Sequence, residues 1–466
     1  MFAHRRPIVW EGSALTVLVA AQALLFGRLV GTDTDFDEGV YLTSLDALEH
    51  GQRLGADVFA PQPPGWYLLL RLFSAAGADS VRGFHVGMVV VAIATCLAAY
   101  GLGRAIAGPW AGLTASALLT VAPPFPLYAH RVLADIPPLG LALLAFWLAW
   151  EARERGSIAL AAGAGATVAL TLTLKPTAVI ALPTFLLLLL WGRQVRGRLA
   201  AGALAGAAVV ALASLVVYRD VVGELWASVV TYHRAARDTP AVIDKTHELV
   251  TFLNFRTPFT WLVVAGAVAS FWLWRSRVAP AVAALWLWAA VSLAFLVYHR
   301  PLHENHLLLL PVVLAVPAGI ALAVAAGRSR FPAVAAGVVA LALAAGYVQQ
   351  QRRVSLDQVD EEPALVAAAE TLRRMTRPDD LVVSDHSIVP FLADRRVPGA
   401  LVDTAALRFQ TGSLTSREVL RELDRSEVRA VVVGRAFADQ PELLRGLSSR
   451  YSTVPAPLGL RIYVRR

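Results

Sequence analysis

Long apolar runs recur through most of the chain, and no other feature restricts its possible folds as strongly. Gly, Ala, Leu and Val dominate these runs from Ser13 to Val348. Many of the runs are about 17–22 residues long, which is the length of a membrane-spanning helix. Hydrophobic residues make up 57% of the 466 positions and charged residues only 16%, whereas about a quarter of an average soluble domain is charged. The sequence therefore predicts a polytopic α-helical membrane protein.

The apolar runs divide into about eleven segments that could each cross the bilayer once. The first run follows two arginines, as in a signal peptide, but it is longer than a typical h-region and no clear A-x-A cleavage site precedes Asp33. We therefore interpret it as an uncleaved first helix. The expected spans are Ser13–Val30, Val81–Arg104, Pro109–Leu127, Ile136–Trp150, Ser157–Leu174, Thr177–Trp191, Leu199–Tyr218, Pro258–Trp274, Ala279–Tyr298, His306–Ala325 and Phe331–Val348.

Arginines gather at alternate ends of the expected spans, as in membrane proteins whose arginine-rich short loops face the cytoplasm. With the N-terminus inside, only Glu11, Glu151 and Glu154 oppose the arginines of the inner ends, which are Arg5, Arg6, Arg104, Arg153, Arg155, Arg193, Arg196, Arg198, Arg275, Arg277, Arg328 and Arg330. The pattern predicts a multi-pass protein of the cell membrane with its N-terminus inside. The outer face then receives the C-terminal part and the loops at 31–80, 128–135, 175–176, 219–257 and 298–305.

The net charge of +8 follows from the same arginines, and no basic stripe with interleaved aromatic residues is present. We therefore expect no nucleic-acid partner. The single cysteine, Cys96, lies inside an apolar run. One cysteine excludes an intramolecular disulfide and a metal site built from cysteines.

The composition changes near Gln350, where the apolar runs end and mixed, charged sequence begins. We divide the chain into a transmembrane domain, residues 1–349, and a small extracytoplasmic α/β domain, residues 350–466. Hydrophobic periodicity predicts helices at Glu361–Met375 and Ser416–Leu423, and buried strands at Leu381–Val383, Ala430–Val433 and Arg461–Val464.

The run Asp385-His386-Ser387 uses the residue types of a hydrolase triad, but the three residues are adjacent in sequence. Members of a triad converge in space from separate segments, so we do not interpret this run as catalytic. A strand-to-helix turn with Ser387 as the helix N-cap explains it better.

Four carboxylates, those of Asp33, Asp35, Asp37 and Glu38, follow the first span within six positions. Asp35 and Glu38 have the spacing of a capping box for a helix at Gly39–His50. Capping explains one or two of the acids, but it does not require Asp37 and Glu38 side by side where a span ends. Two interpretations stay open, a helix cap alone or a cap combined with an active site.

Further polar residues collect at the outer ends of the expected spans. Lys175 follows an apolar run directly, where a lysine is costly unless it lies near the interface or has an anionic partner. It either binds a phosphate, pairs with an acid or extends from a loop to the interface. Arg131 either binds a phosphate or pairs with Asp135 or Asp37. Asp135 is either a site residue or the cap of the helix at Ile136.

A histidine-rich segment, His303-Glu304-Asn305-His306, precedes the tenth expected span. Its two histidines are three positions apart, whereas the zinc-binding HExxH helix places them four apart, so metal binding is the least favoured interpretation. Two other interpretations are open. Arg300, His303 or His306 binds a lipid phosphate, or the segment is an ordinary polar loop.

In their order along the chain, these residues resemble a bacterial family that includes the aminoarabinose transferases of lipid A and the protein O-mannosyltransferases. The resemblance covers the membrane part in outline and is strongest at Asp37-Glu38, at Pro63-Pro64 and at Arg131 to Asp135. Lys175 and the run His306–Pro311 also look like family positions. The resemblance implies the GT-C fold and a glycosyltransferase that uses a polyprenyl-phosphate sugar.

The resemblance also implies that Asp37 is the catalytic base. The aminoarabinose transferases have a lysine immediately before the Pro-Pro pair, where this chain has Gln62. One cation that contacts phosphate is therefore missing, and we do not predict aminoarabinose as the sugar.

Sugar transfer from a lipid phosphate needs a base for the acceptor hydroxyl and fixed positive charge for the leaving phosphate. We expect an inverting displacement in which Asp37 deprotonates an acceptor hydroxyl of a glycolipid, a cell-wall glycan or a protein on the outer face. The expected catalytic residues are Asp37, Glu38 and Asp135. The expected substrate-binding residues are Gln62, Tyr67, Arg131, Lys175, Arg300, His303 and His306.

A transporter or flippase of lipid-linked sugars is the main alternative, and a non-catalytic scaffold with a sensor domain is a second. Transporters place ionisable residues near the bilayer midplane, often at broken helices, whereas the spans here are almost free of charge. The sequence assigns no cofactor and leaves a divalent cation open.

Overall fold

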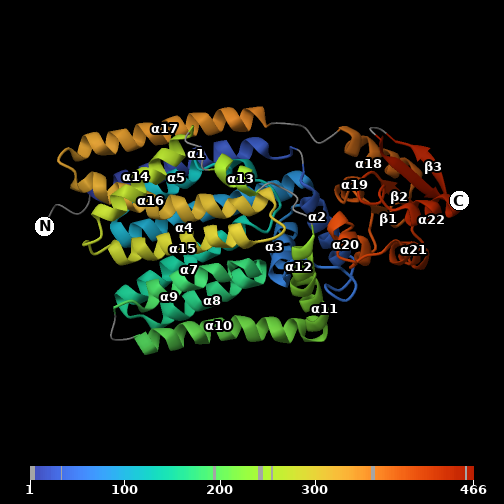
Figure 1. Cartoon of the computed structure of the whole chain (residues 1–466), viewed down its shortest axis with the longest axis horizontal. Helices are drawn as coiled ribbons and strands as arrows, with labels where there is room; N and C mark the ends of the chain where they lie inside the picture. The colour runs from blue at the N-terminus through green and yellow to red at the C-terminus, as the bar shows by residue number, and fades with distance from the viewer. Residues whose placement is uncertain are drawn as a thin grey trace.

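The computed structural model describes residues 6–32, 34–192, 196–239, 245–252, 256–357, 363–456 and 459–466. Its long helices form a bundle, and the C-terminal domain lies at one end of that bundle (Figure 1). Short helices from the loops lie at the junction of the two parts (Figure 1).

Every predicted span overlaps a helix of the bundle. Within the described residues, six helices are long and apolar enough to cross a membrane, and they contain α1, α4, α10, α15, α16 and α17. The total number of crossings and their direction remain predictions. The bundle consists of α1 (Arg6–Phe26), α4 (Val81–Ala107), α5 (Pro109–Thr120), α7 (Ile136–Arg155), α8 (Ile158–Leu174), α9 (Leu182–Leu190), α10 (Arg196–Tyr218), α14 (Pro258–Trp272), α15 (Ala279–Tyr298), α16 (Leu309–Arg328) and α17 (Pro332–Leu356).

Two predicted spans are interrupted by irregular backbone near prolines. The span predicted at Pro109–Leu127 is split, because α5 ends before Pro123-Pro124 and the short α6 (Phe125–Tyr128) follows. Proline lacks a backbone N–H and keeps the preceding residue out of the helical conformation. The span predicted at Thr177–Trp191 begins as a 3-10 helix, η2 (Pro176–Ala181), and continues as α9. Neither segment is one continuous α-helix, and whether each crosses the membrane stays a prediction.

Short helices connect the bundle to the C-terminal domain, and α2, α3, α11 and α12 are seen at the junction in Figure 1. α2 begins three residues before its predicted start at Gly39. The connecting elements are α2 (Phe36–Glu49), α3 (Pro64–Ala75), α11 (Val222–Trp226), α12 (Tyr232–Ala235), α13 (Lys245–Phe252), η1 (Gly27–Leu29), η3 (Arg219–Val221), η4 (Ala227–Thr231), η5 (Ala236–Asp238) and η6 (Glu304–Leu308).

The C-terminal domain has a mixed four-stranded sheet in the order β1-β2-β4-β3. In the centre of the sheet, Val431 pairs in parallel with Val383 and antiparallel with Tyr463. The strands are β1 (Val382–Ser384), β2 (Ala430–Val433), β3 (Tyr451–Pro455) and β4 (Arg461–Arg465). The helices are α18 (Pro363–Met375), α19 (Ile388–Leu392), η7 (Gly399–Leu401), α20 (Ala406–Gln410), α21 (Ser416–Arg425) and α22 (Pro441–Arg450).

The predicted strand at Ala430–Val433 is found with the same bounds, and the other predicted elements of this domain are found within a few residues. The start of the helix predicted at Glu361–Met375 lies outside the described residues. β3 was not predicted, because Tyr451–Pro455 has no continuous apolar run. α17 extends to Leu356, through the predicted domain boundary at residue 350.

The run Asp385-His386-Ser387 does form a strand-to-helix turn, with Ser387 before α19. The Ser387 side chain makes no capping hydrogen bond, and its hydroxyl is buried without a partner among the described residues. Asp385 accepts hydrogen bonds from the backbone N–H groups of Gly434 (2.8 Å), Arg435 (2.7 Å) and Phe437 (2.9 Å). Asp385 therefore joins β1 to the loop that follows β2.

A single apolar core joins the connecting helices to the C-terminal domain. It includes Val40 from α2, Trp66 from α3, Ile388 from α19 and Val432 from β2, all of them buried. Burial of such side chains is the main favourable term in packing two parts together. The residues that follow the first span are therefore fixed against both the bundle and the C-terminal domain.

Candidate active site

The acidic run after the first span forms a capping box at the start of α2. The Asp35 carboxylate accepts the N–H of Asp37 (3.0 Å), and the Glu38 carboxylate accepts the N–H of Asp35 (2.8 Å). These bonds satisfy backbone donors that have no partner inside the helix. Capping therefore occupies Asp35 and Glu38, while Asp33 lies outside the described residues.

Glu38 also ties α2 to two other segments. Its second oxygen accepts the Val132 N–H (2.6 Å) and lies 3.0 Å from Nε2 of His85. The Nδ1 atom of His85 accepts the Gly31 N–H (3.0 Å), so Nε2 carries the proton that is donated to Glu38. Glu38 and His85 are fully buried. Glu38 consequently holds its neighbour Asp37 in place, and it has no carboxylate oxygen left over for a substrate.

Asp37 differs from its neighbours because no hydrogen bond to its side chain is found among the described residues. The side chain is half-buried. Desolvation, followed by the charges of Asp35, Asp403 and Asp135, raises the pKa of Asp37 to about 8, although Lys175 acts in the opposite direction. A carboxyl group with a pKa this close to neutrality is suited to take up and release a proton.

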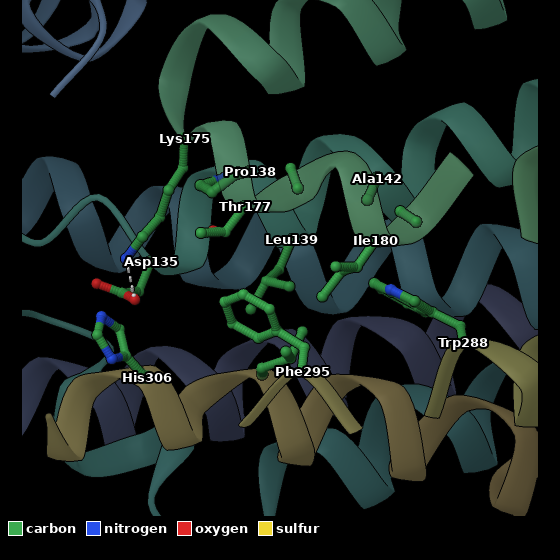
Figure 2. Close-up of a pocket in the computed structure, with 13 residues that line it drawn as sticks. Asp135, Pro138, Leu139, Ala142, Lys175, Thr177, Ile180, Trp288, Phe295 and His306 are labelled. Carbon is green, nitrogen blue, oxygen red and sulfur yellow. Dashed lines mark hydrogen bonds and ion pairs between the residues drawn. The ribbon is translucent and has the colours of Figure 1, made fainter. Parts of the chain in front are cut away.

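Lys175 lies at the end of α8 and pairs with Asp135 at the start of α7, as Figure 2 shows. The distance from Nζ to Oδ1 is 2.5 Å, and the other Asp135 oxygen accepts a hydrogen bond from Asn305 (3.3 Å). Both charged side chains are largely buried. Asp135 is therefore the anionic partner of Lys175, and binding of a phosphate by Lys175 stays a prediction. Asp135 lies at the N-cap position of α7 but makes no capping bond.

The Asp135–Lys175 pair lies at one end of an apolar groove, which we call the lipid groove (Figure 2). His306 faces the pair from η6, and the groove continues between α7, η2 and α15 along Leu139, Phe295, Ile180 and Trp288. Its empty volume is about 480 Å³. One charged end and one long apolar path suit an amphiphile with an anionic head.

Arg131 pairs with Asp35, and the distance from Nη1 to Oδ2 is 3.3 Å. Its guanidinium also lies 5.2 Å from the ring centre of Tyr128, a favourable cation–π arrangement. The predicted pairing with Asp135 or Asp37 is not the one found, because the capping acid lies within reach instead.

Gln62 and Tyr67 come from the segment that leads into α3. The Gln62 amide donates to the hydroxyl of Tyr41 (3.1 Å), and the Tyr67 side chain is buried. Gly65 allows α3 to contact the end of α8, because a Cβ atom there would lie 2.3 Å from the Thr173 hydroxyl oxygen. The segment Pro63-Pro64 therefore lies next to the end of α8, where Thr173 precedes Lys175 by two positions.

The remaining predicted residues, His303, His306 and Arg300, differ in their surroundings. His303 and His306 are linked, because His306 Nδ1 accepts the His303 N–H (3.2 Å). Burial lowers the pKa of His303, so its ring is neutral at pH 7. Arg300 is exposed and makes no ion pair among the described residues. Its contact with phosphate stays a prediction.

No group of three or more His, Cys, Asp or Glu side chains in the described part of the chain is arranged to hold a metal ion. The sequence analysis did not assign His85, Asn305 or Asp403 to the site. The charge of Asp403 acts on Asp37. A signal for His85 was present, since it is a polar residue in an otherwise apolar span. No comparable signal marked Asp403.

Comparison with known proteins agrees with this architecture. Residues 61–218 match the family model described as dolichyl-phosphate-mannose-protein mannosyltransferase. This segment contains Asp135 and Lys175, but it begins after Asp37 and therefore does not include it. ArnT from Cupriavidus metallidurans, in a structure bound to undecaprenyl phosphate, is similar with a TM-score of 0.68 and 15% identity over 99% of this chain and 98% of that chain. The chain has the GT-C glycosyltransferase fold.

A second solved structure with this fold is more distant. The apo oligosaccharyltransferase from Archaeoglobus fulgidus gives a TM-score of 0.62 with 14% identity, over 98% of this chain and 74% of that chain. The sequence matches none of the curated proteins. The likeness to both structures extends over the GT-C bundle and the C-terminal domain, because almost the whole chain is covered.

Proposed function

We propose that this protein is a membrane glycosyltransferase that moves a sugar from a polyprenyl-monophosphate donor to an acceptor hydroxyl on the outer face of the membrane. The observation that carries this proposal is the lipid groove, which ends at Lys175 and lies close to Asp37. The charge of Lys175 lowers the pKa of Asp37, which supports an electrostatic link between the two residues. The undecaprenyl phosphate bound to ArnT supports a donor of this class.

On the donor side, the polyprenyl chain lies in the lipid groove and the phosphate contacts Lys175. The phosphate takes over part of the interaction that Lys175 makes with Asp135. Asp135 and Asn305 then keep the lysine in position. Fixed positive charge stabilises the negative charge that develops on the phosphate as the sugar leaves.

On the acceptor side, Asp37 removes the proton from the acceptor hydroxyl. The oxygen attacks the anomeric carbon as the bond from that carbon to the phosphate oxygen breaks. The products are an inverted glycoside, polyprenyl phosphate and protonated Asp37. Glu38 orients Asp37 and takes no part in proton transfer. His306 faces the donor phosphate at the mouth of the lipid groove.

The test uses purified protein in lipid nanodiscs with a panel of polyprenyl-phosphate sugars and a membrane extract as the source of acceptor. The expected result is release of free polyprenyl phosphate from at least one donor, and loss of that release in Asp37→Asn. A transporter would move the donor across a vesicle membrane without consuming it. Intact donors throughout the panel, with flip-flop in vesicles, would overturn the proposal.

A further inference from the structure

The C-terminal domain touches α2 next to Asp37. A Cβ atom on Gly39 would lie 2.3 Å from the backbone nitrogen of Ile388, so only glycine allows this contact. The guanidinium of Arg435 lies 4.8 Å from the ring centre of Phe36. The domain is therefore packed against the helix turn that carries Asp37.

A second contact links the domain to the loop before α3. The Gly399 N–H donates to the side chain of Gln52 (2.7 Å), and the Phe59 N–H donates to the carbonyl of Gly399 (3.2 Å). The ring of Phe59 lies between the Arg408 guanidinium (3.8 Å) and the ring of Tyr232 (5.4 Å). Residues 399–408 are thus held against the same outer surface of the bundle.

This segment contains a buried carboxylate that the mechanism above does not use. The Asp403 residue is only 4% exposed, and its side chain accepts the Ala405 N–H (2.9 Å), its sole hydrogen bond among the described residues. Arg408 lies nearby but donates to the backbone carbonyls of Asp403 (2.6 Å), Ala400 (3.1 Å) and Ser413 (3.3 Å). Desolvation raises the pKa of Asp403, as expected for a carboxylate that lacks full compensation.

The hydroxyl of Tyr67 is buried without a hydrogen-bond partner among the described residues, and the charges of both carboxylates act on it. Tyr67 is 2% exposed, and Ser44 and the backbone of Gln62 are near its hydroxyl, but neither makes a hydrogen bond of ordinary geometry with it. Desolvation and then the charge of Asp403 raise the pKa of Tyr67, and Asp37 contributes in the same direction. A buried hydroxyl usually has a hydrogen-bond partner in a native protein.

We propose that Asp403 of the C-terminal domain and Tyr67 of α3 bind the acceptor hydroxyls beside Asp37, and that they select an uncharged, hydroxyl-rich acceptor. This inference rests on the proposed glycosyltransferase function. Hydroxyl groups of the acceptor donate to the Asp403 carboxylate and accept from the Tyr67 hydroxyl, which satisfies both groups. In their ionised forms, Asp37 and Asp403 repel an anionic acceptor, because like charges in a low-dielectric site are costly.

The test compares neutral methyl glycosides with the corresponding uronic acids as soluble acceptors. The readout is release of polyprenyl phosphate from whichever donor the wild-type protein consumes. Wild type is expected to prefer the neutral acceptor. Asp403→Asn should raise KM for the neutral glycoside about tenfold, the effect of a lost hydrogen bond to a charged group, with little change in kcat. Asp403→Asn should also reduce the preference for the neutral glycoside over the uronic acid. Tyr67→Phe should raise KM for the neutral glycoside.

The matched control is Asp385→Asn, which alters another buried carboxylate of the same domain. Among the described residues, Asp385 accepts hydrogen bonds only from backbone N–H groups of its own domain. Its substitution should lower the unfolding temperature and leave the acceptor KM unchanged. If wild type releases polyprenyl phosphate but Asp403→Asn keeps the wild-type KM and preference, this inference is wrong. If wild type consumes none of the donors, the proposed function itself fails.

Discussion

The donor side and the acceptor side of the candidate site differ in their charge. On the donor side, Lys175 and Asp135 neutralise each other at 2.5 Å, and Asn305 completes the arrangement. On the acceptor side, Asp37 and Asp403 lack a cationic partner with a direct bond to their carboxylates among the described residues. Under the proposed function, this difference places a cation where the phosphate is held and carboxylates without an ion pair where a proton is accepted.

Physical chemistry gives the difference a direct consequence. A bound phosphate can share the lysine on the donor side, because an ammonium group has three hydrogen-bond donors. On the acceptor side, desolvation and then the excess negative charge raise the pKa of Asp37 to about 8. A base of that strength accepts a proton readily, which supports the proposal that the acidic side activates the acceptor.

The strongest way to break the comparison is Asp37→Asn, which removes the base and leaves its volume unchanged. We expect kcat to fall about 10³-fold, within the range for general-base catalysis. The measurement is release of polyprenyl phosphate under saturating donor. Asp35→Asn is the control, since asparagine caps a helix as well as aspartate does. Equal losses in both variants would assign the effect to the helix start and contradict a base at Asp37.

The next largest effect is expected for Lys175→Gln on the donor side. Loss of the cation removes stabilisation of the leaving phosphate, so kcat/KM for the donor should fall about 10²-fold. Asp135→Asn should cost less, because the amide still accepts a hydrogen bond from Lys175. If Asp135→Asn is the more damaging of the two, then Asp135 is the residue that acts on the substrate, and Lys175 only supports it.

The pH dependence sharpens the acceptor side. The active form of Asp37 is deprotonated, and its raised pKa of about 8 means that this form grows as pH rises through 8. Below that value, kcat/KM should fall about tenfold for each pH unit. Asp403→Asn removes one of the charges that raise this pKa, so its midpoint should move to lower pH. A flat profile between pH 6 and 8 would contradict the assignment of Asp37.

The smallest effect on activity is expected for His85, which holds Glu38 and thereby positions Asp37. His85→Phe removes the hydrogen bonds to Glu38 and to the Gly31 N–H, at a cost of about 2 kcal/mol in stability. The unfolding temperature should fall, and kcat should drop several-fold because Asp37 is less well held.

His130→Phe is the matched control for His85. The His130 ring packs edge-to-face against His85 with centres 4.7 Å apart, and neither of its buried nitrogen atoms has a partner among the described residues. Burial lowers the pKa of His130 to about 3, so the ring is neutral. Its replacement should be neutral or stabilising. Equal effects of the two substitutions would contradict the support role of His85.

Much of this arrangement was predictable from the sequence. Apolar length locates the helices of the bundle, and the Asp35 and Glu38 spacing predicts the capping box, because both are local patterns. Local spacing does not report which side chains meet across the fold. The pairing of Lys175 with Asp135, the use of Glu38 by His85 and the approach of Asp403 to Asp37 all depend on contacts between distant segments.

The most direct test of the two-sided site is a structure of the protein with polyprenyl phosphate bound. The account predicts that the phosphate lies within hydrogen-bond distance of Lys175 Nζ, on the side that faces Asp37. It also predicts that the polyprenyl chain follows the lipid groove along Phe295 and Trp288. A phosphate bound elsewhere, with the Lys175–Asp135 pair unchanged and the lipid groove empty, would contradict the account.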